Sequence, residues 1–297
     1  MSTPQPTLKE TILGLLNPWV FLSLSASCLP RTILNLVREG RYSVLFSPSQ
    51  LQEAWFTQFW TTIAGPNIRL NAGERVVPLL QGRVTRGEVT ETKVGPAIGG
   101  VVLEVGAGAG LWVDMYRQVA RIEPSSEHTT DGLTQRGVGK NASQEGVITH
   151  IYGVEPNPNQ HPYLRQAIAS SSLTSTYQIV PVGIEDLSDG TLWDGRVEKG
   201  SVDCIVSILC LCSIPEPEKN IRELYSYLKK GGRWYVYEHV RCLINVFWPH
   251  FIGGCLLCRP TEKTIREAGP WEKIDVARPP IEPWYGTLPH ILGTFTK

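Results

Sequence analysis

Short apolar runs alternate with helical patterns along the last two thirds of this chain. Apolar runs of this length are typical of buried strands, and strands that alternate with helices predict a parallel sheet covered on both faces. The runs lie at 100–105, 149–154, 177–182, 202–212 and 233–240, and the helical patterns at 111–119, 162–169 and 217–229. Two further runs, at 272–277 and 290–295, permit an antiparallel hairpin at the edge. We therefore expect a Rossmann-like α/β fold with a doubly wound, mainly parallel sheet of seven strands and that edge hairpin.

The pattern is helical over residues 31–60. Apolar side chains recur there at three- and four-residue spacing, with a turn at 46–49 in which Ser47 or Ser49 can cap the second helix. The aromatic side chains of the second helix either pack into the core or line a ligand site. They are Trp55, Phe56, Phe59 and Trp60.

Two segments lack a regular pattern. Residues 63–99 are rich in glycine and proline, which predicts a loop-rich junction. Residues 121–147 are polar and contain several glycines, which predicts an inserted loop. The expected organisation is a helical region at 1–62, the junction, and an α/β domain at 100–297 that carries the insertion.

Residues 11–30 contain no charged side chain and are strongly apolar. A helix that spans a membrane needs about 20 such residues, but Asn17 and Pro18 interrupt the run and serines dilute its second half. Three interpretations stay open: a helix that covers the α/β domain as a lid, an anchor on or in a membrane, and a signal sequence. The polar start, with Lys9 beside Glu10, lacks the positive region of a signal sequence, and we favour the lid.

The charges of the chain balance, with 28 Lys and Arg against 28 Asp and Glu. Proteins that bind nucleic acid carry a basic excess, so nucleic acid is not an expected partner; the pattern does not define an oligomeric state. The 7 cysteines are an odd number, and most lie in or beside apolar runs, which favours reduced thiols in an intracellular compartment. Cys255 and Cys258 form a C-x-x-C pair without a second pair at zinc-site spacing, and we predict neither a metal nor a disulfide.

Three glycines, Gly106, Gly108 and Gly110, directly follow the first strand, which ends in Glu104 and Val105. Such glycines allow a tight turn from strand to helix whose backbone approaches a ligand closely. The spacing differs from the G-x-G-x-x-G/A of dinucleotide-binding folds, whose third glycine would stand one position later.

Acidic side chains follow the next two strands. Glu155 ends the second strand, and Glu185 and Asp186 follow the third. Because the carboxyl ends of parallel strands meet at one edge of a sheet, Glu155 is expected in the same crevice as the glycines, where it can accept both hydroxyls of a ribose. Glu185 and Asp186 either bind an adenine amino group or cap the next helix.

These features in this order resemble the class I S-adenosylmethionine-dependent methyltransferases, whose first strand ends in E-x-G-x-G-x-G and whose second strand ends in an acid. The resemblance is closer to the methyltransferase-like protein 7 family, also called alkyl thiol methyltransferases, and it covers residues 55–297. The most specific motifs of this resemblance are Pro156-Asn157-Pro158-Asn159 and Glu238-His239-Val240. The segments that carry it are 64–66, 103–106, 155–159, 200–203, 211–214, 228–232, 238–240, 247–248 and 254–255.

The resemblance implies S-adenosylmethionine as the cofactor. The predicted cofactor-binding residues are Glu104, Gly106, Ala107, Gly108, Gly110, Glu155, Pro156, Asn157, Glu185, Asp186 and Leu209. The family has G-C-G-T-G at 106–110 and Asp in place of Glu155, and both departures keep this chemistry. The larger departures, at 121–147 and 73–97, bear on the substrate. Residues 11–30 correspond to a hydrophobic anchor of the family, which implies a cytoplasmic location or the cytosolic face of the endoplasmic reticulum membrane.

Methyl transfer from a sulfonium needs an aligned nucleophile and a dry site. A thiol, with a reference pKa of ~8.5, needs a weaker base than a phenol, with a reference pKa of ~10. His239, at the end of the fifth strand, is either that base or a structural histidine, and at most one of Glu238 and His239 faces the site.

We therefore expect a methyltransferase that acts on a small lipophilic thiol, or on a phenol or carboxylate oxygen of a secondary metabolite. Two alternatives stay open at this point. One is a protein of the same fold and cofactor that catalyses a reaction without methyl transfer, such as a cyclisation. The other is a non-catalytic, membrane-associated protein.

Overall fold

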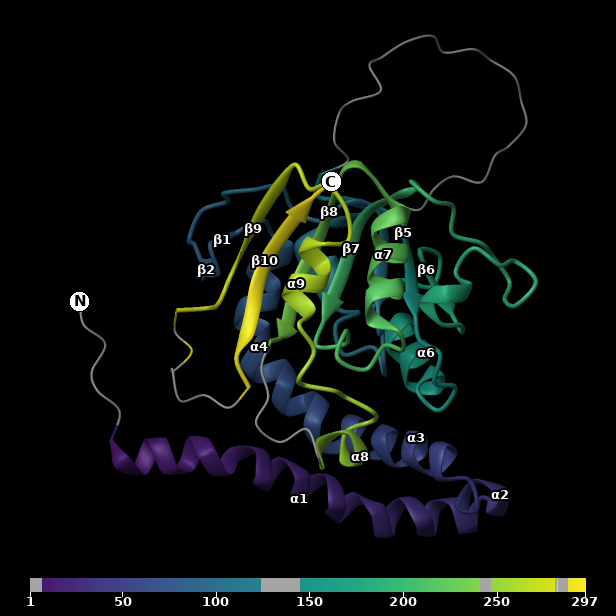
Figure 1. Ribbon diagram of the computed structural model, residues 1–297. Coiled ribbons are helices and arrows are strands. Elements are labelled where there is room, and N and C mark those ends of the chain that lie inside the picture. Colours follow the sequence, from purple (N-terminus) through teal and green to yellow (C-terminus); the bar gives the residue numbers. More distant parts are fainter. Residues whose placement is uncertain (1–6, 124–144, 241–246, 281, 283–287) are drawn as a thin grey trace.

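The centre of the computed structural model, which describes residues 7–123, 145–240, 247–280, 282 and 288–297, is a sheet of eight strands (Figure 1). Their order is β4 (Arg121–Ile122), β5 (Val147–Val154), β3 (Gly100–Val105), β7 (Val202–Ile208), β8 (Leu228–His239), β10 (His290–Thr296) and β9 (Lys273–Ala277), and β6 (Tyr177–Val180) also pairs with β5. Among these described strands, β10 pairs antiparallel with both β8 and β9, and the other pairs are parallel. The predicted mainly parallel sheet with an antiparallel edge pair is confirmed, but it has eight strands and not seven, because the two-residue strand β4 adds one at the edge. We call the edge at which the parallel strands end the carboxyl edge.

Successive side chains of the central strands fill two different apolar cores, as the period of two in a strand requires. On one face Val102 and Val206 pack against α4 (Gly65–Leu80), α5 (Met115–Val119) and α6 (His161–Ser170). On the other face Leu103 and Ile205 pack against α7 (Pro217–Tyr227) and α9 (Thr261–Arg266). The sheet is therefore doubly wound, as predicted.

Helices from the start of the chain lie across the carboxyl edge. They are α1 (Leu8–Arg38), α2 (Tyr42–Leu45), α3 (Pro48–Phe59) and the π-helix η1 (Trp60–Ala64), which continues into α4. Figure 1 shows α1 and α3 beneath the strand ends, with the short helix α8 (Trp248–Phe251) beside them. The Phe21 ring lies 5.0 Å from the Phe59 ring and 5.5 Å from the Trp248 ring. The predicted turn near 46–49 is confirmed, and Ser47 is the N-cap residue of α3, although its side chain makes no capping hydrogen bond.

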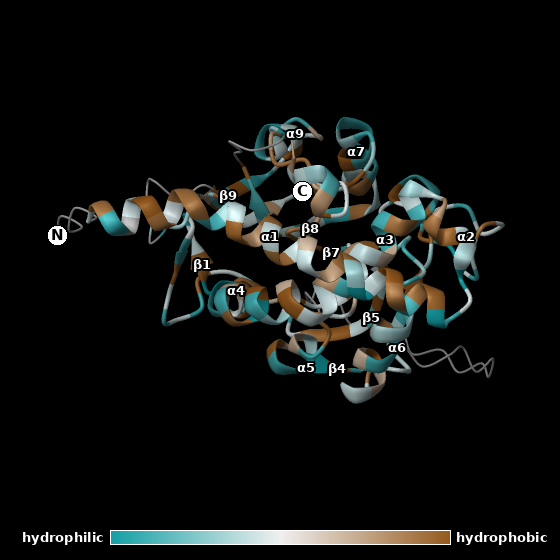
Figure 2. Cartoon of the chain, turned by 90° about the horizontal axis from the view of Figure 1, so that it is seen from below, coloured by the Kyte–Doolittle hydropathy of each residue, from teal (hydrophilic) through white to brown (hydrophobic). Residues whose placement is uncertain are grey.

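The two halves of α1 differ in burial. From Leu22 onward one side of the helix is buried, through Leu22, Cys28 and Leu36, while Leu24, Ile33, Leu34 and Val37 are 38–46% exposed. Apolar side chains of the first half are 47–78% exposed, namely Leu8, Ile12, Leu13, Leu15, Leu16, Trp19 and Val20. Figure 2, seen from below, shows the hydrophobic first half extending beyond the sheet. By length and composition alone, the helical stretch Thr11–Arg38 could cross a membrane.

The prediction of a loop-rich junction at 63–99 is wrong for its first half, where α4 forms. Pro66 lies in the first turn of α4, where a missing N–H removes no helical hydrogen bond. Ala72, Val76 and Leu79 then recur at helical spacing and are buried against the sheet. In α4, burial of one helix face against the sheet therefore outweighs the local effect of glycine and proline. A second difference is that the helix predicted at 111–119 is shorter than expected, since α5 begins at Met115.

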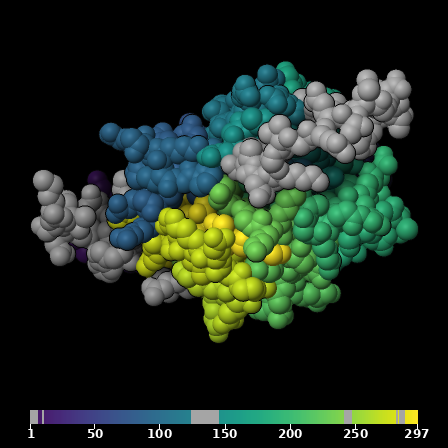
Figure 3. All heavy atoms as spheres, turned by 90° about the horizontal axis from the view of Figure 1, so that it is seen from above, coloured from purple at the N-terminus to yellow at the C-terminus, as the bar shows by residue number. Residues whose placement is uncertain are grey.

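The opposite, amino edge of the sheet is covered by a small hairpin, β1 (Val84–Thr85) with β2 (Glu88–Val89). Figure 3, seen from above, shows this part of the chain in blue beside the yellow C-terminal strands. The Thr85 hydroxyl and the Arg86 backbone N–H donate to the Asp275 carboxylate at 2.9 and 2.6 Å. A pocket of about 200 Å³ opens there, remote from the carboxyl edge. Of the predicted insertion at 121–147, residues 124–144 lie outside the described residues, and its ends belong to β4 and β5.

Candidate active site

The turn after β3 combines tight packing with one open position. All three glycines have a left-handed backbone, with φ of +67° at Gly106, +56° at Gly108 and +82° at Gly110. A Cβ at Gly106 would lie 2.5 Å from the Cβ of Cys210, and one at Gly110 would lie 2.5 Å from the Cβ of Ala167. At Gly108 the nearest atom would be 3.6 Å away. Gly106 and Gly110 therefore hold the turn against its neighbours, and Gly108 leaves its surface open to a ligand.

Glu155, which directly follows β5, reaches this turn. Its Oε2 accepts the Gly108 backbone N–H and its Oε1 accepts the Asn157 backbone N–H, both at 2.8 Å. Burial raises the pKa of Glu155 to about 7, although both hydrogen bonds lower it. A carboxylate offers about four acceptor positions, so lone pairs remain for two ribose hydroxyls. The turn and Glu155 together fit the nucleoside part of S-adenosylmethionine.

Glu104 lies in the core beneath the turn. Its Oε2 accepts a hydrogen bond from the Tyr177 hydroxyl at 2.6 Å. Tyr177 lies on β6 and reaches Glu104 over Gly153 of β5, because a side chain at that position would occupy the place of the hydroxyl. Burial raises the pKa of Glu104 to about 7. Its Oε1 is buried and has no hydrogen-bond partner in the described part of the chain. Such an orphaned oxygen is commonly satisfied by an ordered water or by a ligand group.

The remaining predicted cofactor contacts follow the same edge. Leu209, directly after β7, has a left-handed φ of +55°, and strain of this kind in a non-glycine residue clusters at functional sites. Glu185 and Asp186 form part of η2 (Ile184–Asp186) beyond β6, and neither makes a side-chain cap of that helix. Glu185 is exposed and accepts the Asn220 side-chain N–H at 3.3 Å. Ala107 and Pro156 contribute backbone next to the glycine turn and to Glu155.

The two neighbours at the end of β8 have different surroundings. Glu238 is fully buried, and its Oε1 accepts the backbone N–H groups of Cys210 and Leu211 at 3.1 and 3.2 Å. Burial raises the pKa of Glu238 to about 7. His239 points to the opposite face, where burial lowers the pKa of its imidazole well below the ordinary value. Glu238 thus supports the loop after β7, and His239 is neutral at pH 7.

The helices across the carboxyl edge also contact these loops. The Arg41 guanidinium donates to the Asn159 side-chain oxygen at 3.0 Å, in the loop after Glu155. The Trp60 indole nitrogen is the side-chain atom nearest the open position of Gly108. Sequence reasoning singled out the aromatic stripe but could not decide between core and ligand wall. Phe59 is core, being fully buried, whereas Trp60 borders the turn.

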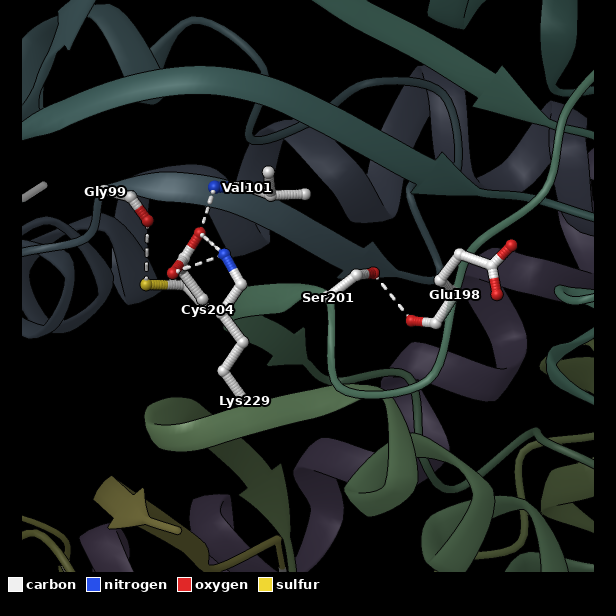
Figure 4. A network of polar contacts seen from close by, with 7 residues as sticks. Gly99, Val101, Glu198, Ser201, Cys204 and Lys229 are labelled. Carbon is white, nitrogen blue, oxygen red and sulfur yellow. Dashed lines mark hydrogen bonds and ion pairs between the residues drawn. The ribbon is translucent and has the colours of Figure 1, made fainter. Parts of the chain in front are cut away.

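One motif of the family resemblance, 200–203, lies at the amino edge instead (Figure 4). The Asp203 carboxylate accepts the Val101 backbone N–H at 2.8 Å and the Lys229 ammonium at 2.9 Å. A Cβ at Gly100 would lie 2.3 Å from the same carboxylate, so only glycine fits there. This network joins the starts of β3, β7 and β8 and is structural.

The cysteines contain one departure from expectation. Cys258 is disulfide-bonded, so the prediction of no disulfide is wrong; spacing along a sequence does not reveal which thiols meet in space. Five other cysteines are free thiols, namely Cys28, Cys204, Cys210, Cys212 and Cys255. Within the described residues, no three His, Cys, Asp or Glu side chains gather in a way that could hold a metal ion.

Comparison with known proteins agrees with this geometry. Residues 89–262 match the methyltransferase domain family. Thiol S-methyltransferase TMT1A from Homo sapiens is 30% identical over 173 residues, which cover 54% of this chain and 68% of the relative. Thiol S-methyltransferase TMT1B from Rattus norvegicus is 26% identical over 195 residues, which cover 62% and 77%.

The solved CurJ carbon methyltransferase has a TM-score of 0.53 at 15% identity, over 99% of this chain and 72% of the other, a likeness of fold. These matches do not favour a cyclase or a non-catalytic protein. The open glycine turn and the acid that faces it fit the cofactor that the family uses. The chain therefore belongs to the methyltransferase domain family, shares a family with thiol S-methyltransferase TMT1A, and is an S-adenosylmethionine-dependent methyltransferase.

Proposed function

We propose that this enzyme methylates the sulfur of a small lipophilic thiol. The relatives of known activity are thiol S-methyltransferases. The observation in this chain that supports the proposal is an apolar, largely aromatic cluster between the N-terminal helices and the carboxyl edge. Its aromatic members are Phe21, Trp55, Phe56, Phe59, Trp60, Trp248 and Phe251. Its partly buried members, Trp60 among them, can contact an apolar acceptor, and the packed remainder excludes water from the carboxyl edge.

The residues of the site would share the work as follows. Bound S-adenosylmethionine supplies a methyl group on a positively charged sulfur. Glu155 and the glycine turn hold the nucleoside, and Glu238 keeps the loop after β7 in place. His239 is neutral at pH 7 and lies at the end of β8, beside this loop. Most of the rate enhancement then comes from alignment and exclusion of water, because the displacement needs no covalent help from the protein.

The acceptor class is tested with labelled cofactor and a panel of alkyl thiols, phenols and carboxylic acids. We expect S-methyl thioethers as the products, identified by mass spectrometry, with higher kcat/KM for longer alkyl chains. Glu267→Gln, on the exposed end of α9, serves as a matched surface control and should leave the rates unchanged. Methylation of oxygen alone would overturn the thiol assignment.

We also propose that the exposed first half of α1 rests on a membrane surface and holds this intracellular enzyme on the cytosolic face of a membrane, the endoplasmic reticulum being the expected one. Seven apolar side chains between Leu8 and Val20 are about half exposed or more, and one of them, Trp19, also contacts the Phe247 ring. The second half of α1 packs over the site, so one helix can serve both as anchor and as lid.

Flotation with phospholipid vesicles tests this attachment. The triple variant Leu13→Glu, Leu16→Glu, Val20→Glu should stay with the soluble fraction and keep its activity on a water-soluble thiol. Leu70→Glu, which adds one negative charge on the exposed face of α4, should still float, and each single substitution in α1 should weaken flotation less than the triple variant does. Flotation of the triple variant with the wild type would exclude α1 as the anchor.

A further inference from the structure

A second histidine stands beside His239. Because β10 runs antiparallel to β8, its first residue, His290, pairs with the last residue of β8, His239. Both imidazoles therefore lie at the carboxyl edge, and their ring centroids are 4.6 Å apart. The sequence places His290 in the last predicted strand, 51 positions from His239 (290 − 239), and does not reveal this contact.

His290 is held by a carboxylate. Its Nδ1 lies 2.6 Å from Oε1 of Glu282, and its backbone N–H donates to Oε2 of the same side chain at 2.9 Å. Both side chains are largely buried, with 15% and 12% exposed. With Nδ1 donating to the carboxylate, Nε2 is the nitrogen left to accept a proton. A carboxylate that orients an imidazole in this way is the arrangement by which many enzymes prepare a general base.

The two imidazoles have different surroundings. Burial raises the pKa of the Glu282 carboxyl, but the hydrogen bonds from His290 and the positive charge of Arg75 outweigh it, so that the pKa is lower than ordinary. Tyr237 stacks on His290 at 4.6 Å and stays neutral, because burial raises the pKa of its hydroxyl to about 12. On the other side, the Nδ1 of His239 is buried and has no partner among the described residues. Of the two imidazoles, His290 is therefore the one that a carboxylate contacts and orients.

We propose that His290, oriented by Glu282, is the general base that takes the proton of the acceptor thiol, and that the neutral His239 is a positioning residue beside it. This inference rests on the proposed function. In the step, the S–H bond breaks and its proton moves to Nε2 of His290. The sulfur electron pair forms the new bond to the methyl carbon, and the electron pair of the broken carbon–sulfur bond stays with the departing thioether, S-adenosylhomocysteine. The imidazolium then returns its proton to water.

The first test compares acceptors with the full-length enzyme. His290→Gln should lower kcat/KM for an alkyl thiol by ~10²-fold or more, the usual effect of losing a general base. A strongly acidic thiophenol is already ionised at neutral pH, so its rate should fall less than about threefold on the same reasoning. Affinity for S-adenosylhomocysteine, measured by calorimetry, should not change. His250→Gln, an exposed histidine on α8, is the matched control. Equal losses on both acceptors would make His290 structural and overturn the proposal.

The second test addresses Glu282 as a positioning residue, and its first measurement needs no turnover. In the cofactor-free wild type, NMR of the ring nitrogens should show the His290 proton on Nδ1, and Glu282→Gln should change this tautomer because the carboxylate that fixes the proton is lost. In the same variant kcat/KM should fall for the alkyl thiol and fall less for the acidic thiophenol. An unchanged His290 tautomer would refute the pairing. If the wild type methylates phenols and no thiol, the thiol assignment fails separately, and phenols of high and low acidity then test His290 in the same way.

Discussion

The substitution Glu155→Gln tests the cofactor site most directly. Glu155 is 8% exposed, and its two oxygens accept two backbone N–H groups at 2.8 Å. Glutamine keeps the size and one oxygen but removes the charge. Hydrogen bonds to charged groups contribute about 1.5–3 kcal/mol and neutral ones about 0.5–1.5 kcal/mol. If two ribose hydroxyls bind here, the variant loses about 2–3 kcal/mol, which is about 30- to 150-fold in affinity.

The pH dependence provides an independent check. Burial raises the pKa of Glu155 to about 7, so the carboxylate form that accepts hydroxyl hydrogens is lost as the pH falls through this value. From the ionisation equilibrium, a group with this pKa is about 90% ionised at pH 8 and about 10% ionised at pH 6. Cofactor affinity of the wild type should therefore fall about tenfold from pH 8 to pH 6, and affinity of Glu155→Gln should stay nearly constant.

Isothermal titration calorimetry with S-adenosylhomocysteine at pH 6, 7 and 8 measures both effects. Thermal unfolding at each pH shows whether the variant is folded. Glu267→Gln again removes one negative charge at the surface and should bind as the wild type does. An unchanged affinity at pH 8, or the same pH dependence in wild type and Glu155→Gln, would remove Glu155 from the cofactor site.

Three further substitutions test the supports of the site. Burial raises the pKa of Glu238 from its ordinary 4.5 to about 7, so ionisation of Glu238 destabilises the folded state as the pH rises. Between pH 5 and pH 8 the wild type should therefore lose about 2–3 kcal/mol more unfolding free energy, measured with urea, than Glu238→Gln. Equal losses in the two proteins would contradict the burial of this carboxyl. Gly106→Ala should abolish cofactor binding in calorimetry, since the new Cβ would lie 2.5 Å from the Cβ of Cys210. Normal binding would show that the backbone of the turn can shift to accommodate the methyl group. Asp203→Ala should cost about 1–3 kcal/mol of unfolding free energy because the Val101 N–H loses its acceptor, while cofactor affinity stays the same; a large loss of affinity would contradict its structural role.

The sequence alone was sufficient for the features that depend on near neighbours in the chain. The strands were predictable because buried runs and helical spacing are local periodicities. The glycine turn was predictable because left-handed backbone selects glycine within a few residues of a strand end. Glu155 could be placed opposite the turn because parallel strands bring their carboxyl ends to one edge, which is a rule of topology and not of side-chain contact.

Only the tertiary structure decided which distant side chains meet. It formed α4 where glycine and proline predicted loop, because burial of Val76 and Leu79 against the sheet outweighs weak local preferences. It brought Trp60 to the open side of the glycine turn and placed the Glu238 carboxylate against the backbone of the loop after β7.

The pairing of His239, His290 and Glu282 has the same origin. Their contacts follow from the register of β10 on β8 and from the position of Glu282 beside His290, and neither leaves a periodic signal in the sequence. The residue type determines the functional group of a side chain, but its protonation state and its partners depend on how deeply it is buried and on which residues pack against it. For this reason the contact between Glu155 and the glycine turn could be predicted from the sequence, and the proposed base could be recognised only in the folded chain.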